Sequence, residues 1–119
     1  MTHKILIIAR SAPYGSSLAK EGLDYVLTSA AYDQEICLLF SGDGLFQLLK
    51  QQEPRGIHLK SQLAAMEILP LYDIENLLAV EEDLIERNIQ SDQLGVKVRL
   101  IKRAEVGQLI HAHHKVISF

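Results

Sequence analysis

A chain of 119 residues in which 48% are hydrophobic can bury a core, and we expect one domain over residues 1–119. Its net charge of −3 creates no field that would attract a polyanion, which argues against direct nucleic-acid binding. One cysteine excludes an internal disulfide and a thiolate metal cage. The apolar run Ile5–Ala9 is too short for a membrane span and lacks the layout of a signal peptide, so we expect a cytoplasmic protein.

The first predicted element is a strand over Ile5–Ala9, which lacks polar alternation as strands do when both sheet faces are covered. A turn over residues 10–15 follows, and Ser16 or Ser17 can cap the next helix. Apolar residues of that helix recur at three- and four-residue spacing and form one stripe. They are Ala19, Gly22, Leu23, Val26, Leu27 and Ala30. A second strand, buried on both faces, is predicted over Ile36–Phe40.

A turn with two glycines around Asp43 follows the second strand and leads into a short helix that ends at Leu49. This turn lies where open α/β sheets place their sites and interfaces, just past the carboxyl end of a strand. The polar segment 51–60 is the longest predicted loop. A helix over residues 61–69 comes next, and Pro70 is expected to end it.

The carboxyl-terminal half continues the alternation of strands and helices. A third strand is predicted over Leu77–Val80, and the acidic residues 81–83 suit the first turn of a following helix. Residues 96–100 alternate as in a strand with one wetter face, 104–113 form an amphipathic helix, and 116–119 form a last strand. Five strands separated by helices imply a three-layer α/β/α sandwich with a five-stranded parallel sheet.

Candidate catalytic groups are few. Cys37 lies in the middle of a strand, where a small apolar residue packs well and burial raises the pKa of a thiol, so we interpret it as structural. The loop Arg10–Ser17 precedes a helix as phosphate loops do, but it contains neither glycine-rich phosphate-binding pattern. Asp43 is expected to bond the backbone of its own turn, because the first strand is not followed by the acidic pair of a receiver domain.

Three histidines lie close together at 111, 113 and 114, in the last turn of a predicted helix. Only His111 and His114 would share a helix face, and no carboxylate or thiol is clearly placed to complete a metal site. Imidazoles in a last turn also suit exposed carbonyl groups. We therefore assign no catalytic, cofactor-binding or metal-binding residue and expect no cofactor.

Two apolar clusters are candidates for a protein interface. A helix of barely two turns cannot bury every side, so some of its apolar side chains should be exposed or contact a partner. Interface and core are equally good interpretations at this point. The candidate interface residues are Leu45, Phe46, Leu48 and Leu49 in the first cluster, and Leu71 and Tyr72, beside Leu69 and Pro70, in the second.

Several segments, taken together in order and spacing, resemble the DsrE/DsrF-like family of sulfur-relay proteins from the first strand to the carboxyl terminus. They are Ala12-Pro13-Tyr14-Gly15, Glu21-Gly22-Leu23-Asp24, Asp43-Gly44-Leu45-Phe46-Gln47-Leu48-Leu49, Leu71-Tyr72-Asp73-Ile74-Glu75 and Val116-Ile117-Ser118-Phe119. The resemblance implies a five-stranded parallel α/β/α sandwich. This agrees with the fold predicted from the residues.

The resemblance also implies a heterohexamer with TusB-like and TusD-like paralogues, two copies of each subunit. Such a complex accepts persulfide sulfur from an upstream carrier and passes it toward 2-thiolation of the wobble uridine of certain tRNAs. Its persulfide cysteine belongs to the TusD-like subunit, near the junction of a central strand and the following helix. The corresponding junction here, Ala79–Glu82, has no thiol. The resemblance therefore implies a non-catalytic subunit.

Three other functions remain open from the sequence. The chain could be a sulfurtransferase through its own Cys37, or a DsrF-like subunit in sulfur oxidation. It could also be a small-ligand binding module that uses the Arg10–Ser17 loop.

Overall fold

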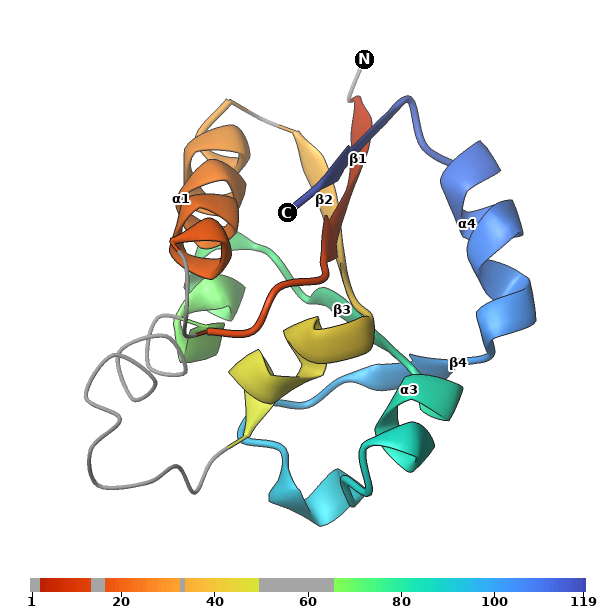
Figure 1. Cartoon of the computed structure of the whole chain (residues 1–119). Coiled ribbons are helices and arrows are strands. Elements are labelled where there is room, and N and C mark those ends of the chain that lie inside the picture. Colours follow the sequence, from red (N-terminus) through yellow and green to blue (C-terminus); the bar gives the residue numbers. More distant parts are fainter. Residues whose placement is uncertain (1–2, 14–16, 33, 50–65) are drawn as a thin grey trace.

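The computed structural model describes residues 3–13, 17–32, 34–49 and 66–119 (Figure 1). In chain order, its strands and α-helices are β1 (Lys4–Ala9), α1 (Leu18–Ala30), β2 (Glu35–Phe40), β3 (Asn76–Val80), α3 (Glu81–Glu86), β4 (Arg99–Ile101), α4 (Val106–His111) and β5 (Lys115–Ser118). Short 3-10 helices are η1 (Gly42–Leu48), η2 (Leu69–Tyr72), η3 (Ser91–Gln93) and η4 (Arg103–Glu105). The predicted loop 51–60 and most of the predicted helix 61–69 lie outside the described residues.

The strands form one sheet in the order β4-β3-β2-β1-β5, and every neighbouring pair is parallel. Helix α1 lies on one face of this sheet and α4 on the other (Figure 1). This confirms the predicted three-layer α/β/α sandwich with a five-stranded parallel sheet. Parallel neighbours need crossover connections, which is why strands and helices alternate along the chain.

Both faces of the central strands are buried, as their continuous apolar runs predict. On the α1 face, Ile7 and Leu38 pack with Val26 of the helix stripe. On the α4 face, Leu6 and Cys37 belong to a smaller cluster. Partly buried residues of α4 cover that smaller cluster. Burial on both faces fixes β1 and β2 as the rigid centre of the fold.

Three elements differ from their predicted form. The predicted strand 96–100 pairs with β3 only over Arg99–Ile101, because Gly95 donates its N–H to the Leu48 carbonyl at 2.7 Å and so directs the chain away from β3. The segment after Gly42 is a 3-10 helix rather than an α-helix. Pro70 lies inside η2, in its first turn, where the absent N–H removes no helical bond.

No helix among the described residues has both the length and the apolar character needed to cross a bilayer.

Candidate functional site

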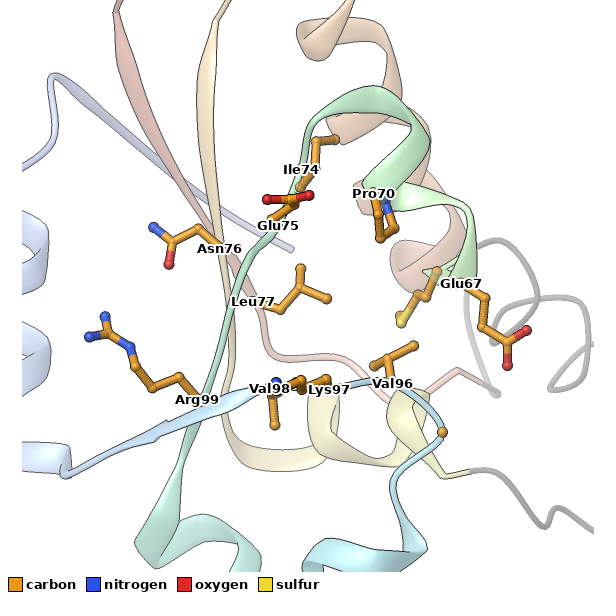
Figure 2. A pocket seen from close by; sticks show the side chains of 12 residues that line it. Glu67, Pro70, Ile74, Glu75, Asn76, Leu77, Val96, Lys97, Val98 and Arg99 are labelled. Atoms are coloured by element: carbon orange, nitrogen blue, oxygen red, sulfur yellow. The ribbon is translucent and has the colours of Figure 1, made fainter.

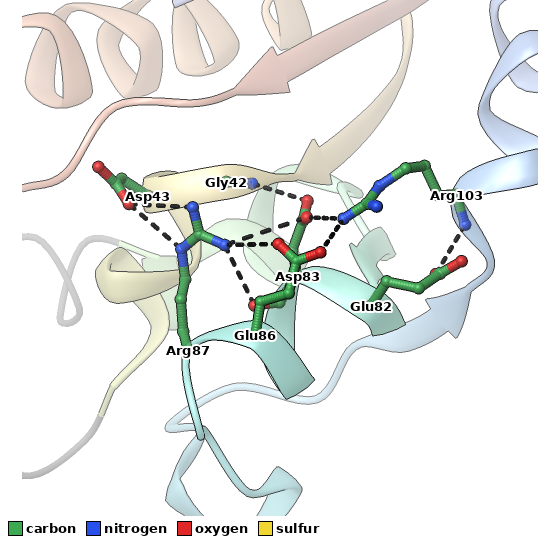
Figure 3. A network of polar contacts seen from close by, with 7 residues as sticks. All are labelled: Gly42, Asp43, Glu82, Asp83, Glu86, Arg87 and Arg103. Carbon is green, nitrogen blue, oxygen red and sulfur yellow. Dashed lines mark hydrogen bonds and ion pairs between the residues drawn. The ribbon is translucent and has the colours of Figure 1, made fainter.

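The candidate site lies at the carboxyl edge of the sheet, where β2 and β3 end side by side. Parallel α/β proteins place their sites at this edge. β2 ends at Phe40 and continues into η1, while Val80 ends β3 and Glu81 begins α3 without an intervening loop. A network of hydrogen bonds and ion pairs joins these two exits to η4 (Figure 3).

Asp83 is the centre of the network. Only 8% of this residue is exposed, and one carboxylate oxygen accepts the N–H of Gly42 at 2.9 Å. The other oxygen pairs with the guanidinium of Arg103. Burial acts to raise the pKa of Asp83, but the Gly42 and Arg103 contacts outweigh it and the pKa is lowered. Asp83 is therefore a fixed anion that holds η1 against α3.

Asp43 has a different partner from the one its sequence context predicts. Its carboxylate accepts a hydrogen bond from Nε of Arg87 at 3.2 Å and pairs with Nη2 at 3.1 Å. The turn's own N–H, that of Gly42, is bonded by Asp83 instead. Gly42 has φ +54, in the left-handed region that glycine adopts without steric cost. The prediction that Asp43 holds its own turn is therefore corrected.

Arg103 links η4 to the first turns of α3. Its guanidinium pairs with Glu86 at 3.0 Å as well as with Asp83, and its backbone N–H donates to Glu82 at 2.8 Å. That backbone bond is the main cause of the lowered pKa of Glu82, and the carboxylates of Glu86 and Asp83 raise the pKa of Arg103. Beside them, Lys102 forms an ion pair with Glu81.

The sequence did not reveal Arg87 or Arg103 as members of this site. Asp43 and Arg87 are 44 residues apart, and Asp83 and Arg103 are 20 apart. Such pairs arise only once strands β2, β3 and β4 lie next to one another. The acidic first turn of α3 was the one signal available from the sequence, and the structure confirms it.

The charged groups of the network hold one another in place. Its carboxylates are occupied by two arginines and by backbone N–H groups, and it contains no hydroxyl, thiol or imidazole nucleophile (Figure 3). The strand–helix junction Val80–Glu81 carries no thiol. Arginine stays protonated at physiological pH, so Arg87 and Arg103 supply permanent positive charges to the carboxylates around them.

Cys37 lies away from this network, in the middle of β2, on the face that α4 covers. Only 1% of the residue is exposed. Burial, partly offset by the charge of Arg99, raises the pKa of the thiol to about 11. The thiol is therefore protonated at neutral pH and shielded from reagents, as the sequence interpretation expects of a structural cysteine.

The remaining sequence candidates fall in separate places. Ser17 is the residue before α1, but its hydroxyl bonds Glu21 at 3.2 Å rather than capping the backbone. His113 bonds the Leu109 carbonyl through Nδ1 at 2.7 Å, and His114 accepts the Lys4 N–H at 2.9 Å. Across the described residues, no three metal-ligating side chains come together. Residues 14–16 of the Arg10–Ser17 loop lie outside the described residues.

The candidate interface residues divide between core and surface. Leu45 and Leu48 are completely buried against the α1 face, so these two side chains offer no surface to a partner. Phe46 and Leu49 are half-buried at the edge of the same cluster. Leu71 is 82% exposed and Tyr72 47% exposed. Among the six candidates, the exposed apolar side chains are therefore the two on η2.

A family model described as the DsrE/DsrF-like family matches residues 3–119. The chain belongs to the DsrE/DsrF-like family. A Protein TusC homolog of Vibrio parahaemolyticus is 34% identical over 116 residues, which cover 98% of each chain. A second one, of Pseudomonas aeruginosa, is 30% identical and covers 99% of each chain. The crystal structure of the ychN protein of E. coli has a TM-score of 0.81 at 23% identity, covering 99% of this chain and 100% of that one. This last likeness concerns the fold alone.

Membership of the DsrE/DsrF-like family gives the carboxyl edge its context. Four of the five segments that suggested the family lie in or directly after α1, η1, η2 and β5, and the fifth, residues 12–15, lies partly outside the described residues. One of them, Asp43–Leu49 in and directly after η1, meets the ion-pair network through Asp43 (Figure 3). The network therefore includes one residue of the segments that suggested the family.

Proposed function

We propose that this chain is the TusC-type subunit of a cytoplasmic sulfur-relay complex and that it carries no sulfur itself. In the proposed complex it assembles with TusB-like and TusD-like paralogues as a heterohexamer with two copies of each. The complex accepts persulfide sulfur from an upstream carrier and passes it toward 2-thiolation of the tRNA wobble uridine. Contact with the carrier and with tRNA would be made by the sister subunits.

One observation carries the non-catalytic role. The junction Val80–Glu81 leads into a cluster of carboxylates pinned by Arg87 and Arg103, and it offers no thiol. The one cysteine of the chain is buried in β2, protonated at neutral pH and covered by α4. A persulfide carrier needs an accessible thiolate. Neither location provides one.

The positive role is to provide a rigid packing surface. The network fixes η1 and α3 relative to each other, and η2 presents Leu71 and Tyr72 to solvent. Exposed apolar side chains that lie together mark surfaces on which partners pack. We propose that Leu71 and Tyr72, with Phe46 and Leu49 beside the core, form part of the packing surface of the complex.

Co-expression with the TusB-like and TusD-like paralogues tests this proposal. We expect the three chains to co-purify, with a native mass that corresponds to two copies of each. Each single omission tests which partner this chain binds. A chain that stays apart from both paralogues would refute the subunit role. If deletion of the gene leaves the level of 2-thiouridine in tRNA unchanged, the result would favour a role of the complex in sulfur oxidation instead.

A further inference from the structure

We propose that His114 makes the pairing of β1 with β5 sensitive to pH, so that the two strands are joined where they begin at neutral pH and separate there in mild acid. This inference goes beyond the proposed function, because it concerns the chain by itself and a residue to which the proposed sulfur relay assigns no role. Two hydrogen bonds between His114 and Lys4, which we term the His114 contact, support it. One of the two depends on the protonation state of an imidazole ring.

The His114 contact lies where the first and the last strand of the chain begin side by side (Figure 1). His114 donates its backbone N–H to the Lys4 carbonyl at 2.8 Å, and Lys4 donates its backbone N–H to Nδ1 of the His114 ring at 2.9 Å. In a regular parallel ladder, a backbone carbonyl of the neighbouring strand would accept that N–H. The ring therefore takes the place of a backbone acceptor, and the pairing begins on a side chain that can titrate.

The bonds at the opposite end of β5 involve no group that titrates near neutral pH. Phe119 donates its N–H to the Ile8 carbonyl at 2.9 Å, and its own carbonyl accepts the N–H of Arg10 at 2.9 Å. The Arg10 guanidinium, which stays protonated, donates to the Ser118 hydroxyl at 3.5 Å. β5 is an edge strand of four residues that pairs with β1 alone. Only its start is therefore expected to respond to mild acid.

The His114 contact requires an unprotonated Nδ1, because an acceptor nitrogen must offer its lone pair. The neutral ring therefore carries its proton on Nε2. Uptake of a second proton turns Nδ1 into a donor that faces the Lys4 N–H, so the ring must turn away and the Lys4 N–H loses its acceptor. Histidine ordinarily changes charge between about pH 5 and pH 8, so this loss falls in mild acid.

The neighbouring ring of His3 strengthens the response to acid. Its centroid lies 5.3 Å from that of the His114 ring, at an interplanar angle of 82°. When both rings are protonated, two like charges lie at this distance and repel each other. Because His3 precedes β1 and His114 precedes β5, the repulsion acts to separate the two strands where they begin.

The other charged groups near this end of the sheet do not hold a protonated ring in place. Glu35 of β2, the register partner of Lys4, is negatively charged, but β1 lies between β2 and β5. Among the described residues, no carboxylate lines the hollow of about 520 Å³ beside His114. The larger cavity, between β3 and residues 95–99, lies toward β4 at the other edge of the sheet, so its charged rim does not face this ring (Figure 2). The titratable side chains that line the hollow with His114 are His3, Tyr25, Tyr32 and Lys115.

His113 provides a comparison within the same turn. Its Nδ1 lies 2.7 Å from the Leu109 carbonyl in the last turn of α4, so this nitrogen is the donor. A second proton on the ring leaves that bond intact, because both ring nitrogens are donors in the charged form. Of two adjacent histidines, one therefore keeps its bond in acid and the other loses it.

Hydrogen exchange of single backbone N–H groups tests the proposal, measured by NMR on the full chain and corrected for the intrinsic effect of pH. From about pH 7.5 to about pH 5, we expect the protection of the Lys4 N–H to fall about three- to tenfold, as for the loss of one hydrogen bond. The Phe119 N–H should keep its protection. The nitrogen NMR signals of the His114 ring should place its proton on Nε2 at neutral pH.

Two substitutions of His114 separate the acceptor from the proton. His114→Asn offers a side-chain acceptor oxygen that does not titrate, so the Lys4 N–H should be protected equally at both pH values. His114→Ala removes the acceptor, so protection should be low at both. His111→Asn is the matched control, because His111 is an exposed histidine in the last turn of α4, and this variant should respond to pH as the parent chain does.

Equal protection of the Lys4 N–H at the two pH values in the parent chain would overturn the proposal. A response to pH that persists in His114→Asn would also overturn it, because another group would then be the one that titrates. A neutral His114 ring with its proton on Nδ1 would exclude the acceptor role, and a loss of protection that extends to Phe119 would exclude a local separation. None of these results depends on whether the paralogues bind, so this inference and the proposed function can fail separately.

Discussion

Asp83 is a paired anion at the edge of the sheet where parallel α/β proteins place their sites. Its carboxylate bonds a backbone N–H from η1 and a guanidinium from η4 at the same time. Three segments that are distant in sequence are therefore held by one side chain. Removal of one partner of such a buried carboxylate is destabilising, because the remaining group is left without its counter-charge.

We expect Asp83→Ala to lower the free energy of unfolding by about 2–3 kcal/mol at neutral pH, because it leaves Gly42 N–H and Arg103 without their acceptor. Asp43→Ala is the control and should cost less than about 1 kcal/mol, since the Asp43 side chain is 61% exposed. Urea unfolding monitored by circular dichroism measures both. Equal losses in the two variants would contradict the central position of Asp83.

The same comparison has a defined pH dependence. The pKa of Asp83 is lowered in the folded chain, so its stabilisation is complete above the unfolded-state pKa, ordinarily 3.8. It is lost as the pH falls through the folded-state pKa, where the carboxylate takes up a proton. The stability difference between the parent chain and Asp83→Ala should therefore shrink in acid. A difference that stays constant from neutral pH into this acid range would exclude the ion pairs as its source.

Among the elements, η1 depends on one glycine more than on its apolar residues. A Cβ built on Gly44 would lie 1.9 Å from the Ala9 carbonyl oxygen and 2.6 Å from its carbon. η1 therefore packs against the end of β1 more closely than any side chain allows. The Gln47 side chain adds a bond from Nε2 to the Ser11 carbonyl at 2.8 Å.

Gly44→Ala should lower the free energy of unfolding by about 2–4 kcal/mol, because backbone rather than a flexible side chain must move. Gly107→Ala is the matched control, since nothing lies within 4 Å of the added methyl group. Gly107 is the second residue of α4, and replacing it by alanine should stabilise the chain by up to about 0.5–1 kcal/mol. Thermal unfolding of the two variants should therefore shift in opposite directions. A shift to lower temperature in both would disprove this account of Gly44.

The strands at the centre of the sheet could be predicted from the sequence, whereas the length of β4 and the form of η1 could not. β1 and β2 are apolar without interruption because both faces are covered, and that pattern is local. β4 is short because Gly95 bonds the Leu48 carbonyl, a contact 47 residues away in sequence that no local pattern encodes. The form of η1 likewise depends on the Ala9 carbonyl above Gly44. Long-range backbone contacts therefore determine both the length of β4 and the form of η1.

At the scale of the whole molecule, the first and the last strand of the chain lie side by side, with β5 at the edge of the sheet. β1 lies between β2 and β5, and the Phe119 ring packs beside Gly22 and Tyr25 of α1. Backbone bonds from Arg10 and to Ile8 hold Phe119 at the end of β1. Because β5 pairs with β1, β1 has a neighbouring strand on each side, and Phe119 after β5 covers part of α1. The candidate site, by contrast, occupies the β2–β3 side of the same edge.

That separation bears on how sulfur would move through the proposed complex. Cys37 lies in mid-strand under α4, whereas the described charges of the network at the carboxyl edge are paired with one another. A reconstituted complex that contains Cys37→Ala should therefore transfer sulfur from a persulfide donor at the rate of the parent complex. The thiol pKa of about 11 leaves the parent Cys37 protonated at neutral pH, so peptide mass analysis should find no sulfur adduct on it. Leu71→Asp is the comparison variant, expected to reduce transfer only as far as it reduces assembly. Loss of transfer in an intact Cys37→Ala complex, together with an adduct on the parent thiol, would make this chain a sulfur carrier.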